Sequence, residues 1–286
     1  MKKFFYLFVI LFLCTGCFKR DEFENITIYT SNYPVKYITE RLYGNNSEIT
    51  SIYPNGTDIE TYKLNKKQIK DYSSGNLFIF NGLMDQEKEY VTQMFDENKH
   101  LKIIDSTLSM EYTNDINELW LNPSNFLMIS QNIKTGLAEY ITNHYMIEEI
   151  TKNYEDLKLE ISEIDANLKL MGESSSKKLI VTSSDLFKFL EKYGIEVISL
   201  EENENLNEKI INDVIDYIKS GKIKYIYLKQ DEKVNDTIQS IIDKTKVKTI
   251  NIYTLSTISD EQENNEQDYV SIMNENINLF KQELYD

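Results

Sequence analysis

The sequence predicts an α/β protein with two βα lobes, each containing a mainly parallel four-stranded sheet, joined by one long backbone helix. Short apolar runs alternate with helical patterns as far as Ile104. No strand pattern occurs between Pro123 and Met171, and the alternation resumes at Leu179. Strands that alternate with helices favour parallel sheets, and the interruption divides the chain into two lobes.

The first lobe contains four predicted strands and the helices between them. Strand patterns cover residues 26–29, 49–53, 77–80 and 102–104, and helical patterns cover 34–43, 66–72 and 86–96. The third strand is apolar without alternation, which is typical of a strand buried on both faces of a parallel sheet. Pro54-Asn55-Gly56 ends the second strand with a turn signal.

The middle of the chain carries a regular helical stripe. Its apolar residues are spaced alternately by three and four positions: Ile147, Ile150, Tyr154, Leu157, Ile161, Ile164, Leu168 and Met171. This spacing predicts one long helix with a single buried face. A free-standing coiled coil is the alternative, but the βα units that follow directly favour a helix packed on the lobes.

The second lobe repeats the organisation of the first. Strands are predicted at 179–182, 196–200, 224–228 and 248–253, and helices at 186–193, 206–218, 234–244 and 269–284. Parallel sheets of this kind place ligands at the carboxyl ends of their strands. We therefore expect a ligand site where the strand ends of the two lobes face each other.

The N-terminus has the features of a secretory signal. Lys2 and Lys3 precede ten apolar residues, which is too short a run to span a bilayer. Thr15-Gly16-Cys17 resembles the bacterial lipobox, although Cys14 stands where that pattern prefers leucine. We expect lipidation of Cys17 and attachment to the extracytoplasmic face of the bacterial cell membrane.

These patterns define the expected domain organisation. Residues 1–16 form the signal peptide, 17–25 a lipid-anchored tether, 26–122 the N-terminal lobe, 123–173 the connecting helices and 177–286 the C-terminal lobe. Both cysteines lie in the signal region, so the mature chain has neither a disulfide nor a thiolate zinc site.

Composition narrows the range of partners. The formal charge of −16 becomes −18 once the two signal lysines are removed, and no basic stripe remains, which excludes nucleic acid as an expected partner. The acidic tracts 201–208 and 260–268 are interpreted as solvated surface or loop. The sequence also lacks a G-x-S-x-G elbow, a P-loop and a dinucleotide-binding glycine fingerprint, so we do not expect an enzyme.

Several segments at or near strand ends carry recognisable motifs. They are Pro54 to Tyr62, Leu77-Phe78-Ile79-Phe80-Asn81-Gly82, Glu118 to Pro123, Thr182 to Phe189, and Tyr269 to Asn276. In this order and spacing they resemble the solute-binding lipoproteins of zinc and manganese ABC importers, the metal-binding adhesin-lipoprotein group. The resemblance covers nearly the whole mature chain. It implies two βα lobes on a backbone helix, a metal held between them, an ABC permease as partner, and a monomer.

The chain departs from that family at the metal ligands. Glu60 and Glu118 occupy the positions of the first two histidines, Ser184 occupies the third ligand position, and the fourth, usually an acid, falls near Leu255. The two histidines of the chain, His100 and His144, lie outside the site loops, and we expect both on the surface.

The resemblance thus assigns Glu60, Glu118 and Ser184 as metal positions without imidazole or thiolate. Asp58 and Asp185 are nearby candidates for further oxygen ligands. Such a set suits one hard divalent cation, manganese for example, better than zinc. Two alternatives remain open: a surface interaction module that has lost its ligand, and a binder of an organic solute or metal chelate that stacks on Tyr53, Tyr62 and Trp120.

Overall fold

The computed structural model describes residues 25–44, 47–111 and 119–285. The N-terminal lobe is built on a parallel sheet with the strand order β2-β1-β3-β4. Its strands are β1 (Thr27–Thr30), β2 (Glu48–Ser51), β3 (Leu77–Phe80) and β4 (Lys102–Asp105). All four residues of β3 are buried, as the absence of alternation predicted. The predicted parallel sheet is confirmed, with strand boundaries within two residues.

Three helices connect the strands of this lobe: α2 (Tyr33–Tyr43), α3 (Lys66–Ser73) and α4 (Asp85–Glu97). Asn32 begins α2 by accepting a hydrogen bond from the Val35 amide, 3.2 Å away. Asn65 begins α3 with a reciprocal cap. The backbone N–H of Gln68 donates to the Asn65 side chain, and the Gln68 side chain accepts from the backbone N–H of Asn65. Such caps satisfy N–H groups that a helix leaves without internal partners.

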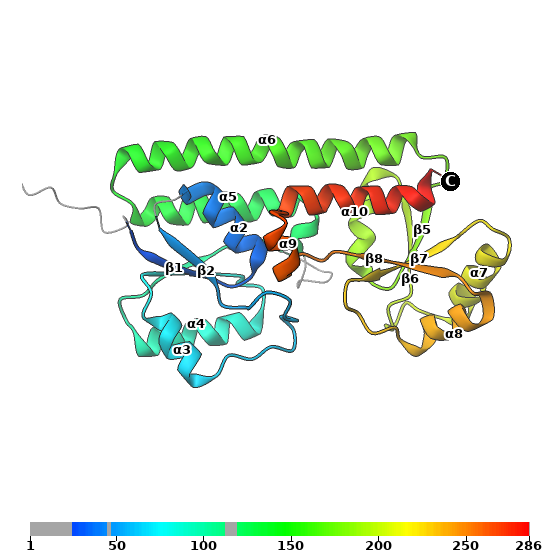
Figure 1. Cartoon of the computed structure of the whole chain (residues 1–286), viewed down its shortest axis with the longest axis horizontal. Helices are drawn as coiled ribbons and strands as arrows, with labels where there is room; N and C mark the ends of the chain where they lie inside the picture. The colour runs from blue at the N-terminus through cyan, green and yellow to red at the C-terminus, as the bar shows by residue number, and fades with distance from the viewer. Residues whose placement is uncertain (1–24, 45–46, 112–118, 286) are drawn as a thin grey trace, which may run out of the picture.

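The middle of the chain folds into η2 (Leu119–Leu121), α5 (Pro123–Tyr140) and the 31-residue α6 (His144–Ser174). Helix α6 runs across both lobes (Figure 1). The predicted apolar stripe is almost entirely buried, and α6 packs on α2, α5, η3 (Asp185–Tyr193) and α10 (Tyr269–Leu284) of the same chain. The coiled-coil alternative is therefore wrong. None of the helices in the described ranges combines the length and apolar character needed to cross a bilayer.

The C-terminal lobe has the same topology, with the strand order β6-β5-β7-β8 and every pair parallel. Its strands are β5 (Leu179–Thr182), β6 (Glu196–Ser199), β7 (Tyr225–Lys229) and β8 (Lys248–Ile252). Its other helices are α7 (Glu208–Lys219), α8 (Asp236–Thr245) and α9 (Asp260–Asn264). Thus each sheet reverses its strand order at its first strand, and a crevice forms beside such a reversal.

Two local expectations for the C-terminal lobe are corrected. The helix predicted over 186–193 is the 3₁₀ helix η3. The tract 260–268, expected to be solvated surface or loop, contains the short helix α9, none of whose residues is buried, so it is surface but not wholly loop. A reciprocal cap between Ser259 and Gln262 starts α9. The sequence therefore lacked the apolar spacing that would have revealed this helix.

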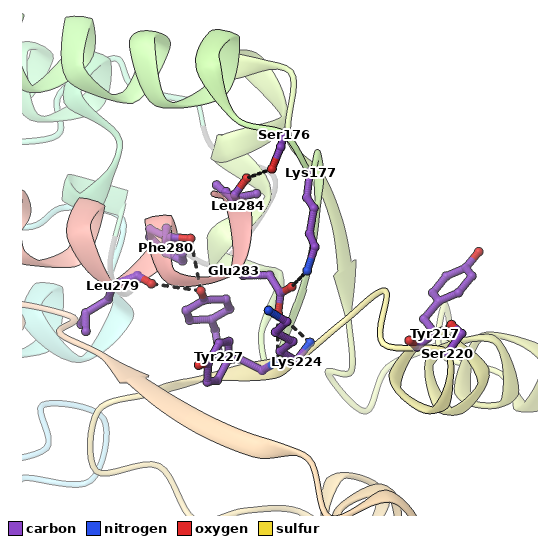
Figure 2. A network of polar contacts seen from close by, with 11 residues as sticks. Ser176, Lys177, Tyr217, Ser220, Lys224, Tyr227, Leu279, Phe280, Glu283 and Leu284 are labelled. Atoms are coloured by element: carbon purple, nitrogen blue, oxygen red, sulfur yellow. Dashed lines mark hydrogen bonds and ion pairs between the residues drawn. The ribbon is translucent and has the colours of Figure 1, made fainter. Parts of the chain in front are cut away.

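The last helix, α10, is fastened to the second sheet by a buried glutamate. Glu283 is fully buried and accepts hydrogen bonds from the amides of Lys224 and Tyr225 at 2.8 and 2.9 Å (Figure 2). Its other oxygen lies 3.0 Å from the Lys177 Nζ. The Tyr227 hydroxyl donates to the carbonyl of Leu279 from the middle of β7. These contacts hold α10 across the amino end of β7.

Candidate functional site

The loop that carries Glu60 is shaped by its neighbour Asp58. One carboxylate oxygen of Asp58 accepts the Glu60 amide at 2.9 Å, and the other accepts the Thr61 hydroxyl at 2.9 Å. Gln86 of α4 supports the loop from behind, donating to the Tyr62 carbonyl at 2.9 Å. Asp58 therefore builds the loop, and the Glu60 side chain is exposed.

The second predicted position, Glu118, lies outside the described residues, as does the lipidation candidate Cys17. The structure describes the chain again from Leu119, where η2 is fully buried. Trp120 donates its indole N–H to the Thr254 carbonyl at 2.8 Å and accepts the Tyr269 hydroxyl on its own carbonyl at 2.6 Å. The segment after Glu118 is thus fixed to the C-terminal lobe.

Ser184, the third predicted position, is buried and already bonded within the protein. It caps η3 by accepting the Leu186 amide at 3.2 Å, and its hydroxyl donates to a Glu201 carboxylate oxygen at 3.1 Å. The same oxygen accepts the Asp185 amide at 2.6 Å. A cation at Ser184 would have to displace Glu201 from this hydroxyl.

Asp185 also forms a local ion pair, with Lys188. Its carboxylate lies 2.9 Å from the Lys188 Nζ. Burial acts to raise the pKa of Asp185, but hydrogen bonds from Lys188 and Ser199 and the positive charge of Lys188 hold it below the usual range. The structure therefore places Asp185 in an ion pair on η3, away from Glu60.

The fourth position is apolar and closed. Leu255 is 2% exposed and packs in the main hydrophobic core. Its φ of +60° lies in the left-handed region, which a leucine rarely adopts. Such a conformation costs about 1–3 kcal/mol unless the surroundings hold it. A leucine side chain offers no ligand atom, so this position cannot supply the acid found in the family pattern.

The described residues contain no group of three or more histidine, cysteine, aspartate or glutamate side chains that could hold a metal ion. Both histidines are exposed and lie away from the site loops, as predicted. Of the predicted metal positions, the structure describes Glu60 and Ser184 only, and Ser184 does not line the pocket that contains Glu60.

A pocket of about 530 Å³ lies between the lobes beside Glu60. The N-terminal lobe contributes the loop 56–61, and the C-terminal lobe contributes the loops 229–233 and 254–259. Sequence reasoning missed the carboxyl end of β7 and the loop after it, which contribute Lys229 and Lys233 to the pocket. The position of the loop at the carboxyl end of a strand was the signal that could have identified it.

The aromatic residues proposed for stacking do not line this pocket. Tyr53 and Trp120 are 2% and 1% exposed, and Tyr62 is half-buried with its hydroxyl bonded to Gln68. The described lining contains Ile59 and otherwise polar residues and glycine, with no aromatic side chain. Stacking on Tyr53, Tyr62 and Trp120 is therefore not available to a ligand in this pocket.

The two lobes also touch directly next to the pocket. Asn55 donates to Asp260 at 3.0 Å and to Glu263 at 2.9 Å. The Gly56 amide donates to the Ile258 carbonyl at 3.0 Å, and the Thr257 hydroxyl donates to the Thr57 carbonyl at 3.1 Å. These contacts join the first-lobe loop to the segment after β8 and close that side of the cleft.

Comparison with known proteins agrees with this architecture. The manganese ABC transporter substrate-binding lipoprotein PsaA of Streptococcus anginosus is 24% identical over 266 residues, which cover 86% of this chain and 82% of PsaA. The zinc-binding lipoprotein AdcA of Streptococcus pneumoniae is 22% identical over 302 residues, covering 95% of this chain and 58% of AdcA.

Solved structures show the same fold. The Zn(II)-bound ZnuA-like domain of Streptococcus pneumoniae AdcA superposes with a TM-score of 0.74 at 20% identity, over 92% of this chain and all of that domain. The metal-dependent lipoprotein YcdH of Bacillus subtilis gives 0.75 at 17% identity, with the same coverage. The family model ZnuA, the periplasmic component A of a zinc-uptake complex, matches residues 28–283. The chain therefore belongs to the ZnuA family of ABC-importer solute-binding proteins, which are not enzymes.

Proposed function

We propose that this chain is the extracytoplasmic, lipid-anchored solute-binding subunit of a metal-type ABC importer, with a ligand site that has diverged from the metal site of its family. The observation that carries the divergence is the state of the family ligand positions in the C-terminal lobe. The Ser184 hydroxyl is bonded to Glu201, and Leu255 is buried in the core. Neither presents a free ligand atom to the cleft.

The role in import is supported by the family and by the predicted lipidation sequence. Relatives are named as binding proteins for manganese, zinc and iron, among them the iron ABC transporter substrate-binding lipoprotein MtsA of Streptococcus pyogenes. The Thr15-Gly16-Cys17 sequence supplies the predicted lipidation site. We infer that the chain acts as a monomer, captures its ligand between the lobes and delivers it to an ABC permease.

Any cation in the ligand is expected to be hard. Glu60, Glu118 and Ser184 remain the proposed metal positions, Ser184 only if a cation displaces Glu201 from its hydroxyl, and they offer only oxygen atoms. Oxygen ligands suit manganese, magnesium or calcium, whereas high-affinity zinc sites use imidazole or thiolate. We therefore expect zinc to stabilise the folded protein no more than manganese does.

Membrane attachment and permease docking test the role directly. The full chain and a Cys17→Ser variant are expressed in a lipoprotein-processing bacterium, and membranes are crosslinked and affinity-purified. We expect the full chain in the membrane fraction with an ABC permease, and Cys17→Ser in the soluble extracytoplasmic fraction. A Cys14→Ser variant, altered next to the predicted cleavage site, is the matched control. Soluble full-length chain, or a membrane-bound chain that captures no permease, would contradict the proposed function.

A further inference from the structure

A second pocket, with a volume of about 320 Å³, lies at the outer edge of the sheet in the C-terminal lobe. Its walls are formed by all four residues of β6, by the start of η3, by the loop that leads to α7, and by one face of α7. It shares no lining residue with the pocket beside Glu60, and α7 lies at the end of the molecule away from the N-terminal lobe (Figure 1). A volume of this size is at the lower end of the range for small-molecule sites, so the pocket has room for a small solute.

The pocket runs along an edge strand whose outer backbone groups are open. In the strand order β6-β5-β7-β8, β6 pairs with β5 alone. The amides of Glu196 and Leu200 donate toward the β5 side at 2.5 and 2.8 Å, so the backbone groups of Val197 and Ser199 between them face the pocket. No hydrogen bond within the described part of the chain reaches the carbonyl groups of those two residues. The edge of β6 therefore supplies acceptors to the pocket.

The wall formed by α7 combines apolar side chains with carboxylates. Ile210, Asp213 and Tyr217 are spaced by three and four positions, so they lie on one face of the helix. Ile198 of β6 packs against the apolar cluster beneath α7 and α8. Because alternate side chains of a strand share a face, Glu196 lies on the same side of β6 as Ile198. Three apolar side chains and two acids thus meet on this side of the pocket.

The charges that line the pocket do not balance. They are those of Asp185, Glu196, Asp213 and Lys188. Asp185 and Lys188 form an ion pair at 2.9 Å, whereas the structure as described gives the carboxylates of Glu196 and Asp213 neither an ion pair nor a hydrogen bond. Lys222 lies outside the lining, and even when its charge is counted, the acids exceed the lysines by one. The pocket therefore has unpaired negative charge.

An apolar pocket with these acceptors suits an organic ammonium ion. An ammonium group offers three hydrogen-bond donors and no acceptor, so it matches carboxylates and outward carbonyl groups. A carboxylate solute would be repelled by the unpaired acids, and a bare metal ion would make no use of the apolar wall. The Lys222 Nζ already lies 3.9 Å from the centroid of the Tyr217 ring, and such rings attract cations to their faces.

We propose that this pocket binds a small organic cation, an amine with an apolar body. The ammonium group contacts Glu196 and Asp213, and the apolar body packs on Ile198, Ile210 and Tyr217. The site is additional to the ligand site between the lobes, and the inference does not depend on the proposed function.

Three probes with the same aromatic ring and different charges test the proposal: 2-phenylethylammonium, 2-phenylethanol and phenylacetate. Each is titrated into the ¹⁵N-labelled, soluble Cys17→Ser protein, and the amide shifts in its NMR spectrum give both the affinity and the location. Because a partly exposed ion pair is a modest contribution, we expect the ammonium probe to bind about threefold more tightly than the alcohol. The carboxylate probe should bind most weakly, and the largest shifts should fall within residues 185–217.

The double variant Glu196→Gln, Asp213→Asn removes both charges and keeps the shapes of the side chains. Glu196 is exposed and Asp213 half-buried, so we expect each to contribute about threefold and the double variant to bind the ammonium probe about tenfold more weakly. Its affinity for 2-phenylethanol should be unchanged. Asp216→Asn is the matched control, since Asp216 is an exposed acid on the same helix that does not line the pocket. Thermal unfolding without a probe shows whether each variant folds.

Several results would overturn the inference. They are equal affinities for the three probes, tighter binding of the alcohol or the carboxylate, shifts that fall outside the pocket, and no saturable binding of any probe. Undiminished binding of the ammonium probe by a folded double variant would overturn it as well. The comparison of the three probes needs only the Cys17→Ser protein, so it decides the inference even if the double variant does not fold. The permease crosslinking tests the importer role separately.

Discussion

Among the described residues, each lobe has one completely buried glutamate, and the two carboxylates have different partners. Glu283 in the C-terminal lobe accepts two backbone amides and pairs with Lys177 at 3.0 Å. Glu87 in the N-terminal lobe accepts one amide, from Asn81 at 2.6 Å, and its second oxygen has no hydrogen-bond partner among the described residues. Both carboxylate oxygens of Glu283 therefore have partners, whereas only one oxygen of Glu87 does.

The difference shows in the pKa of Glu87. Burial raises it to about 8; the Asn81 amide and the nearby Ser31 hydroxyl oppose the rise, and the charge of Asp105 adds to it. Glu87 is thus mostly protonated at neutral pH. The described side-chain atoms that are buried without a partner all lie in this lobe: Thr30 Oγ1, Ser31 Oγ, Asn32 Nδ2, Asn81 Nδ2 and Glu87 Oε1. Among the described residues, the C-terminal lobe thus satisfies its buried side-chain polar atoms, whereas the N-terminal lobe keeps a neutral acid next to Asn81.

Removing the paired glutamate should have the largest effect. Glu283→Ala leaves Lys177 without its partner and the amides of Lys224 and Tyr225 without an acceptor, so we expect a loss of about 3–5 kcal/mol of unfolding free energy. Urea unfolding followed by circular dichroism measures it. The control is Glu208→Ala, an exposed residue on α7. A loss within about 1 kcal/mol of that control would show that the buried ion pair does not anchor α10.

Glu87, which has no ion-pair partner, should make the unfolding free energy depend on pH. Because the folded pKa of Glu87 lies above its unfolded value, its stabilising contribution is complete below about pH 4.5 and is lost as pH rises to about 8. The unfolding free energy of the natural chain should therefore fall relative to Glu87→Gln by up to roughly 1.4 kcal/mol per pH unit in that window. Unfolding curves of both proteins at several pH values test this. Parallel stability profiles would mean that Glu87 titrates normally.

Two serines that follow strands, Ser184 and Ser31, test the same difference between the lobes through a smaller change in stability. Ser184→Ala removes a helix cap and the hydrogen bond to Glu201, so we expect a loss of about 1–2 kcal/mol. Ser31→Ala removes a buried hydroxyl without an aligned partner, and its effect should stay within about 0.5 kcal/mol. Thermal unfolding of the two variants side by side measures the difference. Equal losses would contradict the contrast between the lobes.

The fold could be predicted from sequence because the apolar spacing, the turn signals and the order of strands and helices all indicated the same architecture. The apolar run Leu77–Phe80 and the three-four spacing along α6 reflect burial within short segments, and both predictions were confirmed. The site was harder, because its geometry depends on contacts between distant residues. No local signal showed that Glu201 would bond to Ser184, or that the end of β7 would line the same pocket as Glu60.

Trp120 is the only tryptophan in the chain, and it is buried where its indole N–H reaches the Thr254 carbonyl of the other lobe. The tryptophan fluorescence of this protein therefore comes from a single residue at the junction of the lobes. Any opening that exposes the indole to water would shift its emission to longer wavelength. The emission of Trp120 can therefore report lobe separation in the natural chain. Stopped-flow fluorescence would follow it without an attached dye.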